Sequence, residues 1–178
     1  MISGTTVVFH IQIYEKVLQM NQKTLMATFM VLTLCVASFS FGEDWPRFHG
    51  PNGNGISSET GIMKEWPEEG PNVMWSFSVG EGFGSPAIVD GKVYVLDRVN
   101  DEQDVMRCFD LQTGNQLWNF GYDAPGRLSY DGSRSTPAVD ETHVYSVGPF
   151  GDVYCFSKET QKPVWNVELR KEFGANPP

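Results

Sequence analysis

The sequence has little positive charge. It holds 13 lysine and arginine residues against 22 aspartate and glutamate residues, which gives a net charge of −9 over 178 residues. A surface that binds nucleic acid needs a basic face, and an acidic chain is repelled by anionic membrane surfaces. We therefore expect no nucleic-acid partner for this protein.

Cysteine is also scarce, with three residues in the chain. Cys35 lies in an apolar N-terminal stretch, whereas Cys108 and Cys155 occupy equivalent positions of a repeated segment. Equivalent positions in adjacent units lie too far apart for a disulfide, which needs Cα atoms within about 7 Å. No spacing fits a zinc or haem site. The sequence thus predicts two buried free thiols and no metal site.

Long apolar runs are absent outside Leu25–Ala37. Lys23 precedes this run, and the small residues of Ser40-Phe41-Gly42 follow it. This order predicts a secretory signal peptide over residues 20–42, with a mature start at Glu43 or, alternatively, at Phe41. The alternatives are an uncleaved membrane anchor and a lipid attached to Cys35.

Residues 1–19 precede a stretch that already resembles a complete leader, so we interpret them as an over-extended start without a structural role. The sequence therefore predicts an exported protein of the periplasm or the extracellular space. After cleavage of the signal peptide, we expect no membrane span.

The chain does contain an internal repeat. The segment from Ser85 to Trp118 returns as the segment from Thr136 to Trp165, with proline, tyrosine, cysteine and tryptophan in the same order. A period of about 50 residues is typical of repeat architectures, in which one unit cannot bury its own apolar face. With 40% hydrophobic and 13% aromatic residues, the sequence can form a packed core.

Each unit is predicted to contain four short antiparallel strands and no long helix. In the first unit Asp90-Gly91 is a strong signal for a tight hairpin turn. The Gly/Pro-rich segment 43–72 is predicted to be loop, and residues 73–178 are predicted to hold the repeats. The expected strands are Val73–Val79, Ser85–Val89, Lys92–Asp97, Met106–Asp110 and Gln116–Phe120, then Ser135–Val139, His143–Gly148, Asp152–Ser157 and Pro163–Val167.

Four short strands per unit indicate a β-propeller. The predicted fold is all-β, with about two complete blades, whose strands lie within 73–120 and 135–167, and a partial blade before them. A β-sandwich is the alternative.

One motif is specific. Cys108-x-Asp110-x-x-Thr113-Gly114-x-x-x-Trp118 resembles the tryptophan-docking motif of propellers of the pyrroloquinoline quinone (PQQ) type, with cysteine at a position that is usually alanine. Asp110 and Thr113 can bond turn amides, and Gly114 allows a left-handed conformation. Trp118 is then expected to pack between blades.

The second copy of the motif is degraded. Thr160 and Trp165 remain, whereas Ser157 replaces the aspartate and Gln161 the glycine. Trp75 resembles the docking tryptophan of an earlier, incomplete blade. We expect all these residues to have a structural role in docking one blade on the next.

Two further segments extend the resemblance over residues 44–178. Residues 45–55, Trp-Pro-Arg-Phe-His-Gly-Pro-Asn-Gly-Asn-Gly, and Arg134-Ser135-Thr136-Pro137 are similar to an exported bacterial subgroup of PQQ-like repeat proteins. That family includes alcohol dehydrogenases that hold PQQ and calcium, and BamB-like scaffolds without a cofactor. This sequence has no adjacent cysteine pair, and none of its acids maps onto the catalytic positions.

The resemblance therefore implies a non-catalytic binding or scaffold module without a cofactor. The alternative is a fragment of a PQQ-dependent alcohol dehydrogenase, which would bring PQQ and calcium.

Asp131 and Arg134 are the candidate ligand contacts. They precede a predicted inner strand, where loops surround the mouth of a propeller channel. Arg134 could hold an anionic or sugar-like ligand; alternatively, it pairs with a nearby acid. A protein or a carbohydrate is the ligand class we expect.

A closed propeller has about 4–8 blades. The sequence therefore predicts that the remaining blades, or other copies of the chain, are partners of this protein. A fragment of a longer propeller is the simplest interpretation.

Overall fold

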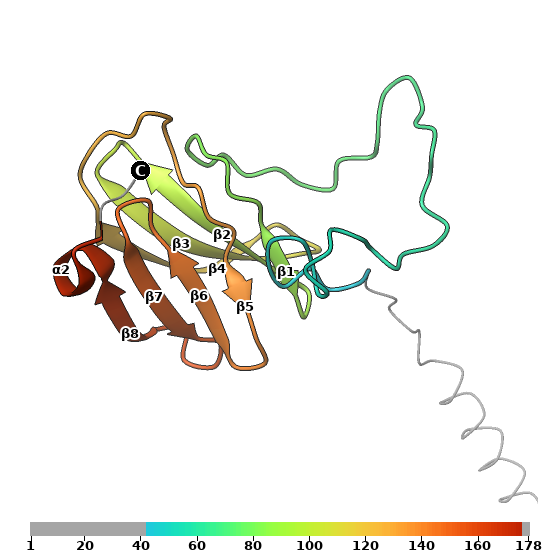
Figure 1. Ribbon diagram of the computed structural model, residues 1–178. Coiled ribbons are helices and arrows are strands. Elements are labelled where there is room, and N and C mark those ends of the chain that lie inside the picture. Colours follow the sequence, from blue (N-terminus) through green and yellow to red (C-terminus); the bar gives the residue numbers. More distant parts are fainter. Residues whose placement is uncertain (1–41, 176–178) are drawn as a thin grey trace, which may run out of the picture. The chain divides into compact units, whose positions relative to one another are not determined.

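The computed structural model describes residues 42–175, which form two four-stranded antiparallel sheets (Figure 1). The first blade consists of β1 (Ala87–Val89), β2 (Lys92–Val99), β3 (Gln103–Asp110) and β4 (Gln116–Asp123). The second blade consists of β5 (Ala138–Val139), β6 (His143–Val147), β7 (Asp152–Ser157) and β8 (Pro163–Glu168), and the short helix α2 (Leu169–Phe173) follows it. In both blades the strands pair in sequence order. The predicted fold, all-β with propeller blades, is confirmed.

The two blades are alike residue by residue. In the first blade Tyr94 pairs with Cys108, and Cys108 pairs with Trp118; in the second blade Tyr145, Cys155 and Trp165 pair in the same way. Each blade also has a register shift directly after its cysteine. Such bulges bend a strand locally, so the repeat in the sequence is also a repeat in backbone geometry.

The first hairpin turn forms as its sequence predicts. Asp90 and Gly91 have φ values of 51° and 67°, the pair of positive angles that a two-residue turn of type I′ requires. The second blade lacks this glycine. There the Asp140 carboxylate accepts hydrogen bonds from the backbone N–H of Thr142 at 2.8 Å and of His143 at 2.6 Å, which closes the longer turn.

The core lies where the two blades meet. Its buried members come from both sheets, and partly buried aromatic rings pack against them. Cys108 and Cys155 are free thiols, and burial raises the pKa of Cys108 to about 11. The core residues are Ala87, Val89, Tyr94, Met106, Cys108, Val144 and Phe156, with Trp118, Phe120, Val139 and Tyr154 packed on them.

Two segments differ from the prediction. Residues 73–79 form no strand, because within residues 42–175 no neighbouring strand pairs with their backbone. Residues 169–173 form α2, a single helical turn that the strand pattern of the sequence does not indicate. The proposed leader falls almost wholly outside the described residues. Within these, no helix is both long enough and apolar enough to cross a membrane.

Candidate functional site

The candidate site is built on two backbone segments that lead into the first strand of each blade. Residues 80–84 precede β1 and residues 132–136 precede β5. The two segments run parallel, with a bridge between Gly82 and Ser133 and a hydrogen bond of 2.7 Å from the Phe83 N–H to the Ser133 carbonyl. The inner edges of the two blades are therefore joined at this point.

Glycine makes this close approach possible. A Cβ at Gly82 would lie 2.9 Å from Ser133 Oγ, and one at Gly84 would overlap the Ser135 carbonyl. Gly132 has a φ of 94°, and a Cβ there would overlap the Glu81 carbonyl. Because side chains alternate along an extended segment, Glu81 and Phe83 project away from the side that the glycines occupy.

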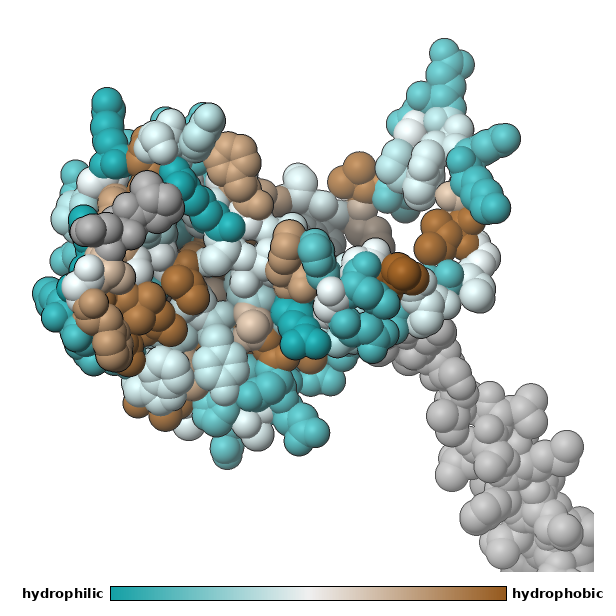
Figure 2. Space-filling view, in the orientation of Figure 1, coloured by the Kyte–Doolittle hydropathy of each residue, from teal (hydrophilic) through white to brown (hydrophobic). Residues whose placement is uncertain are grey.

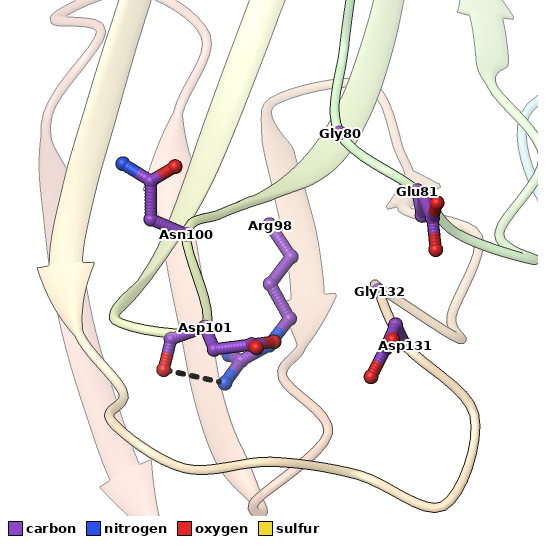
Figure 3. Close-up of a pocket in the computed structure, with 7 residues that line it drawn as sticks. All are labelled: Gly80, Glu81, Arg98, Asn100, Asp101, Asp131 and Gly132. Carbon is purple, nitrogen blue, oxygen red and sulfur yellow. Dashed lines mark hydrogen bonds and ion pairs between the residues drawn. The ribbon is translucent and has the colours of Figure 1, made fainter.

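Glu81 borders a polar hollow of about 240 Å³ (Figure 3). Asp131 and Gly132 also line it, and on the other side Asn100 and Asp101 form the turn after β2. Asn100 and Asp101 have φ values of 55° and 58°, an uncommon conformation for residues other than glycine. Figure 3 shows the Arg98 side chain reaching from β2 toward the Asp101 turn, with Glu81 and Asp131 opposite.

Arg98 forms the buried wall of this hollow, with 1% of its side chain exposed. Its Nη1 donates to Asp104 Oδ1 at 2.8 Å, and its Nη2 donates to the carbonyls of Ala124 at 3.0 Å and Gly126 at 2.5 Å. The guanidinium also lies 5.0 Å from the centre of the Phe150 ring of the second blade. Arg98 thus ties the loops of both blades together, while its buried Nε has no hydrogen-bond partner.

The Asp104 carboxyl is fully buried beside this arginine. Burial raises its pKa, and the hydrogen bond and charge of Arg98 oppose that rise. A buried charge of this kind is tolerated because an opposite charge and hydrogen bonds compensate it. We therefore assign Arg98 and Asp104 a structural role in holding the loops.

A second, apolar hollow of about 310 Å³ lies farther along the same two segments, lined by Phe83, Tyr130 and Arg134. The Phe83 and Tyr130 rings meet edge to face, with centroids 6.1 Å apart and planes at 86°. Arg134 Nη2 makes only long hydrogen bonds, at 3.4 Å to Ser129 Oγ and 3.3 Å to the Tyr130 carbonyl. Its Nε is buried without a hydrogen-bond partner. Arg134 therefore has unused donors beside two exposed rings.

The two ligand contacts suggested by the sequence lie near each other but in different hollows. Asp131 borders the polar hollow and Arg134 the apolar one. Phe83 and Glu81 were missed by the sequence reasoning. The signal for them is the alternation Gly80-Glu81-Gly82-Phe83-Gly84, in which small residues mark the packed side of an extended segment and larger ones the open side.

The docking-motif residues lie elsewhere, in the turn between β3 and β4. Asp110 Oδ1 accepts hydrogen bonds from the Thr113 hydroxyl and N–H, both at 2.8 Å, and from the Gln112 N–H at 3.1 Å. These bonds hold the pKa of Asp110 below its usual value, and the bonds from Thr113 have the largest effect. Trp75 packs on this turn: its Nε1 donates to the Leu111 carbonyl at 2.8 Å, and a Cβ on Gly114 would lie 2.5 Å from its indole ring.

The other two tryptophans of the motif differ in their surroundings. Trp118 is partly buried, and its ring centroid lies 5.8 Å from that of Phe156 in the second blade. Trp165 is 44% exposed on β8. In the turn between β7 and β8, the Thr160 N–H donates to Ser157 Oγ at 3.1 Å, in the place of an aspartate.

Calcium in a protein needs about 6–8 oxygen ligands around one point. Among residues 42–175, no three His, Cys, Asp or Glu side chains come together in a way that could hold a metal ion. Of the acids that line the polar hollow, Asp101 lies near two arginines: its Oδ1 is 3.9 Å from Arg98 Nε, and its Oδ2 is 3.5 Å from Arg127 Nε.

Comparisons with known proteins match a family model to part of the chain and find distant structural likenesses. Residues 101–178 match the family model described as outer membrane protein assembly factor BamB. No curated protein matches the chain. Among solved structures, a europium-containing methanol dehydrogenase is similar with a TM-score of 0.43 and 19% identity, over 55% of this chain. The matched part spans only 18% of that enzyme.

Proposed function

Because residues 101–178 are PQQ-like propeller repeats, we propose that the protein is an exported, non-catalytic module that binds or scaffolds a partner. Its first partners are further propeller blades, from this protein or from other copies of it. The exposed face of the second blade supports this proposal. Fold alone does not determine function, so the argument rests on particular surfaces.

The three docking tryptophans carry the argument. Trp75 and Trp118 each lie partly buried against the blade that follows them, whereas Trp165 is 44% and Val164 54% exposed on β8. Figure 2 shows apolar side chains gathered over β8 and α2. Because the first blade uses the same position to contact its neighbour, the outer face of β8 is suited to receive another blade.

The backbone of residues 71–79 supports the same proposal. Trp75 and Phe77 pack on Phe109 of the first blade, with ring centroids 6.1 Å and 4.7 Å away. Within residues 42–175, however, no backbone hydrogen bond reaches this extended segment. Unpaired backbone donors and acceptors are a template for pairing with a further strand.

Export belongs to the proposal because of the sequence pattern at residues 20–42. N-terminal sequencing of the protein recovered from the cell envelope would find a start near Glu43. A start at Met1 would contradict the proposed export.

Two measurements on the full chain test the proposed function. In sedimentation velocity, we expect association that grows with protein concentration and weakens in the variant Trp165→Ser. Phe48→Ser, which changes an exposed ring elsewhere, should behave as wild type. In a titration with PQQ and Ca²⁺, we expect no saturable binding and no dye-linked oxidation of methanol. A concentration-independent monomer would contradict docking of blades, and alcohol oxidation would instead support a dehydrogenase fragment.

A further inference from the structure

We propose that the polar and apolar hollows on the loops before β1 and β5 together bind a neutral saccharide; this rests on the proposed function as a binding module. The two hollows lie along the same two segments: Gly80, Glu81, Asp131 and Gly132 line the polar one, and Phe83, Tyr130 and Arg134 line the apolar one. One extended ligand can therefore lie along both segments. A site of this kind needs apolar faces and a few well-placed polar groups.

The apolar hollow offers two aromatic platforms. Phe83 is 69% and Tyr130 68% exposed, so both rings are open to solvent. They meet edge to face at 86°, so one ring face remains open to a ligand that covers the pair. A pyranose ring has an apolar C–H face of matching size, and stacking it on the open ring face would remove that aromatic surface from water.

Polar groups around these platforms suit hydroxyl groups. Arg134, whose Nη2 makes only long hydrogen bonds, supplies N–H donors, and the carboxylates of Glu81 and Asp131 supply acceptors. Hydroxyls both donate and accept hydrogen bonds, so a sugar can satisfy both kinds of group at once.

The balance of charge favours a neutral ligand over an anionic one. Glu81, Asp101 and Asp131 line the polar hollow, while the charge of Arg98 is compensated by Asp104 at 2.8 Å. An anion would have to lie beside these carboxylates, on a protein with a net charge of −9. A neutral saccharide accepts the same hydrogen bonds without that repulsion.

The backbone holds these groups in place before any ligand arrives. The close contact of Gly82 with Ser133 and of Gly132 with Glu81 fixes the two segments to each other, and Arg98 fixes the neighbouring loops. Groups held by a rigid frame lose little conformational entropy on binding. The site is thus pre-organised for a ligand that stacks and accepts hydrogen bonds at once.

Isothermal titration calorimetry on the full chain tests the proposal with three probes: maltohexaose, cellohexaose and the acidic sugar trigalacturonate. We expect at least one neutral hexasaccharide to bind and trigalacturonate not to bind. The variants Phe83→Ala and Tyr130→Ala should each weaken binding about tenfold, which corresponds to about 1.4 kcal/mol. Phe48→Ala, which removes a ring with 64% exposure outside the site, should bind as the wild type does.

Because Phe83 and Tyr130 are exposed, both variants should keep the circular dichroism spectrum and unfolding midpoint of the wild type, which separates loss of binding from loss of fold. Three outcomes would overturn the proposal: no binding of either neutral hexasaccharide at millimolar concentration, unchanged binding in both aromatic variants, or binding of trigalacturonate alone. None of these affects the association through Trp165, so failure of the saccharide site is distinguishable from failure of the proposed function.

Discussion

Gln161 occupies a backbone position that suits glycine. Its φ is 58°, and it stands in the second copy of the docking motif where Gly114, with a φ of 71°, stands in the first. A left-handed conformation costs a residue with a Cβ about 1–2 kcal/mol, whereas glycine adopts it freely. The second turn therefore keeps the backbone shape of the motif without the residue that favours it.

We predict that Gln161→Gly stabilises the protein by about 1 kcal/mol, because it removes this backbone strain. The reverse change, Gly114→Gln, should cost about 2 kcal/mol or more, since its Cβ would also lie 2.5 Å from the Trp75 ring. Urea unfolding at equilibrium measures both. Gln112→Gly, in the first turn at a position without positive φ, should destabilise slightly; if Gln161→Gly does the same, the strain is absent.

For single residues, the sequence predicts a contact when both partners lie close together in the chain. The turn contacts of Asp110 with Thr113 follow from residues three positions apart, so the motif itself contains them. Arg98 is different. Its partners include Asp104 in the next strand and carbonyls of Ala124 and Gly126, and nothing in the neighbouring sequence indicates that an arginine will be buried among them.

The turn between β5 and β6 depends on a single carboxylate. Asp140 accepts hydrogen bonds from the N–H of Thr142, the N–H of His143 and the Tyr145 hydroxyl. These bonds lower the pKa of Asp140 from 3.8 to about 2, and the bond from the Thr142 N–H has the largest effect. The charged form is thus favoured by folding, and its contribution to stability is complete above the pKa of the unfolded chain.

We predict that the contribution of Asp140 is lost as the pH falls from about 4 toward about 2, between its unfolded and folded pKa values. The difference in urea midpoint between wild type and Asp140→Asn should be constant from pH 7 to about pH 5 and shrink below it. Glu141→Gln, at an exposed acid of the same turn, serves as the control. A difference that stays the same down to pH 3 would contradict the role of the charge.

Strands were predictable where alternation and a turn signal coincide. β1 and β2 follow from the run around Asp90-Gly91, although in the structure β1 begins at Ala87 and β2 extends to Val99. Residues 73–79 have the same alternating pattern but form no strand, since pairing is a property of neighbours and not of the segment. The parallel bridge between Gly82 and Ser133 was likewise not predictable from the sequence, because it joins residues far apart in the chain.

On the scale of the whole molecule, the two blades share one core. Phe120 on β4 contacts Tyr154 and Phe156 on β7, with ring centroids 5.6 Å away in both cases, and Tyr122 stacks on Tyr154 at 4.3 Å. In repeat proteins such contacts between neighbours supply much of the stability of each unit. The two blades should therefore unfold together as long as these rings remain.

We predict that Phe120→Ala uncouples the blades. The substitution should lower the free energy of unfolding by about 2–3 kcal/mol. This is at or below the usual loss for a buried phenylalanine, because the Phe120 ring is only partly buried. Scanning calorimetry should then show two transitions, or one broadened transition, in place of one. Leu117 lies on the opposite side of the same strand and is 43% exposed, so Leu117→Ala should cost less than about 1 kcal/mol and leave a single transition. If both variants unfold in a single transition, the aromatic contacts of Phe120 are not what couples the blades.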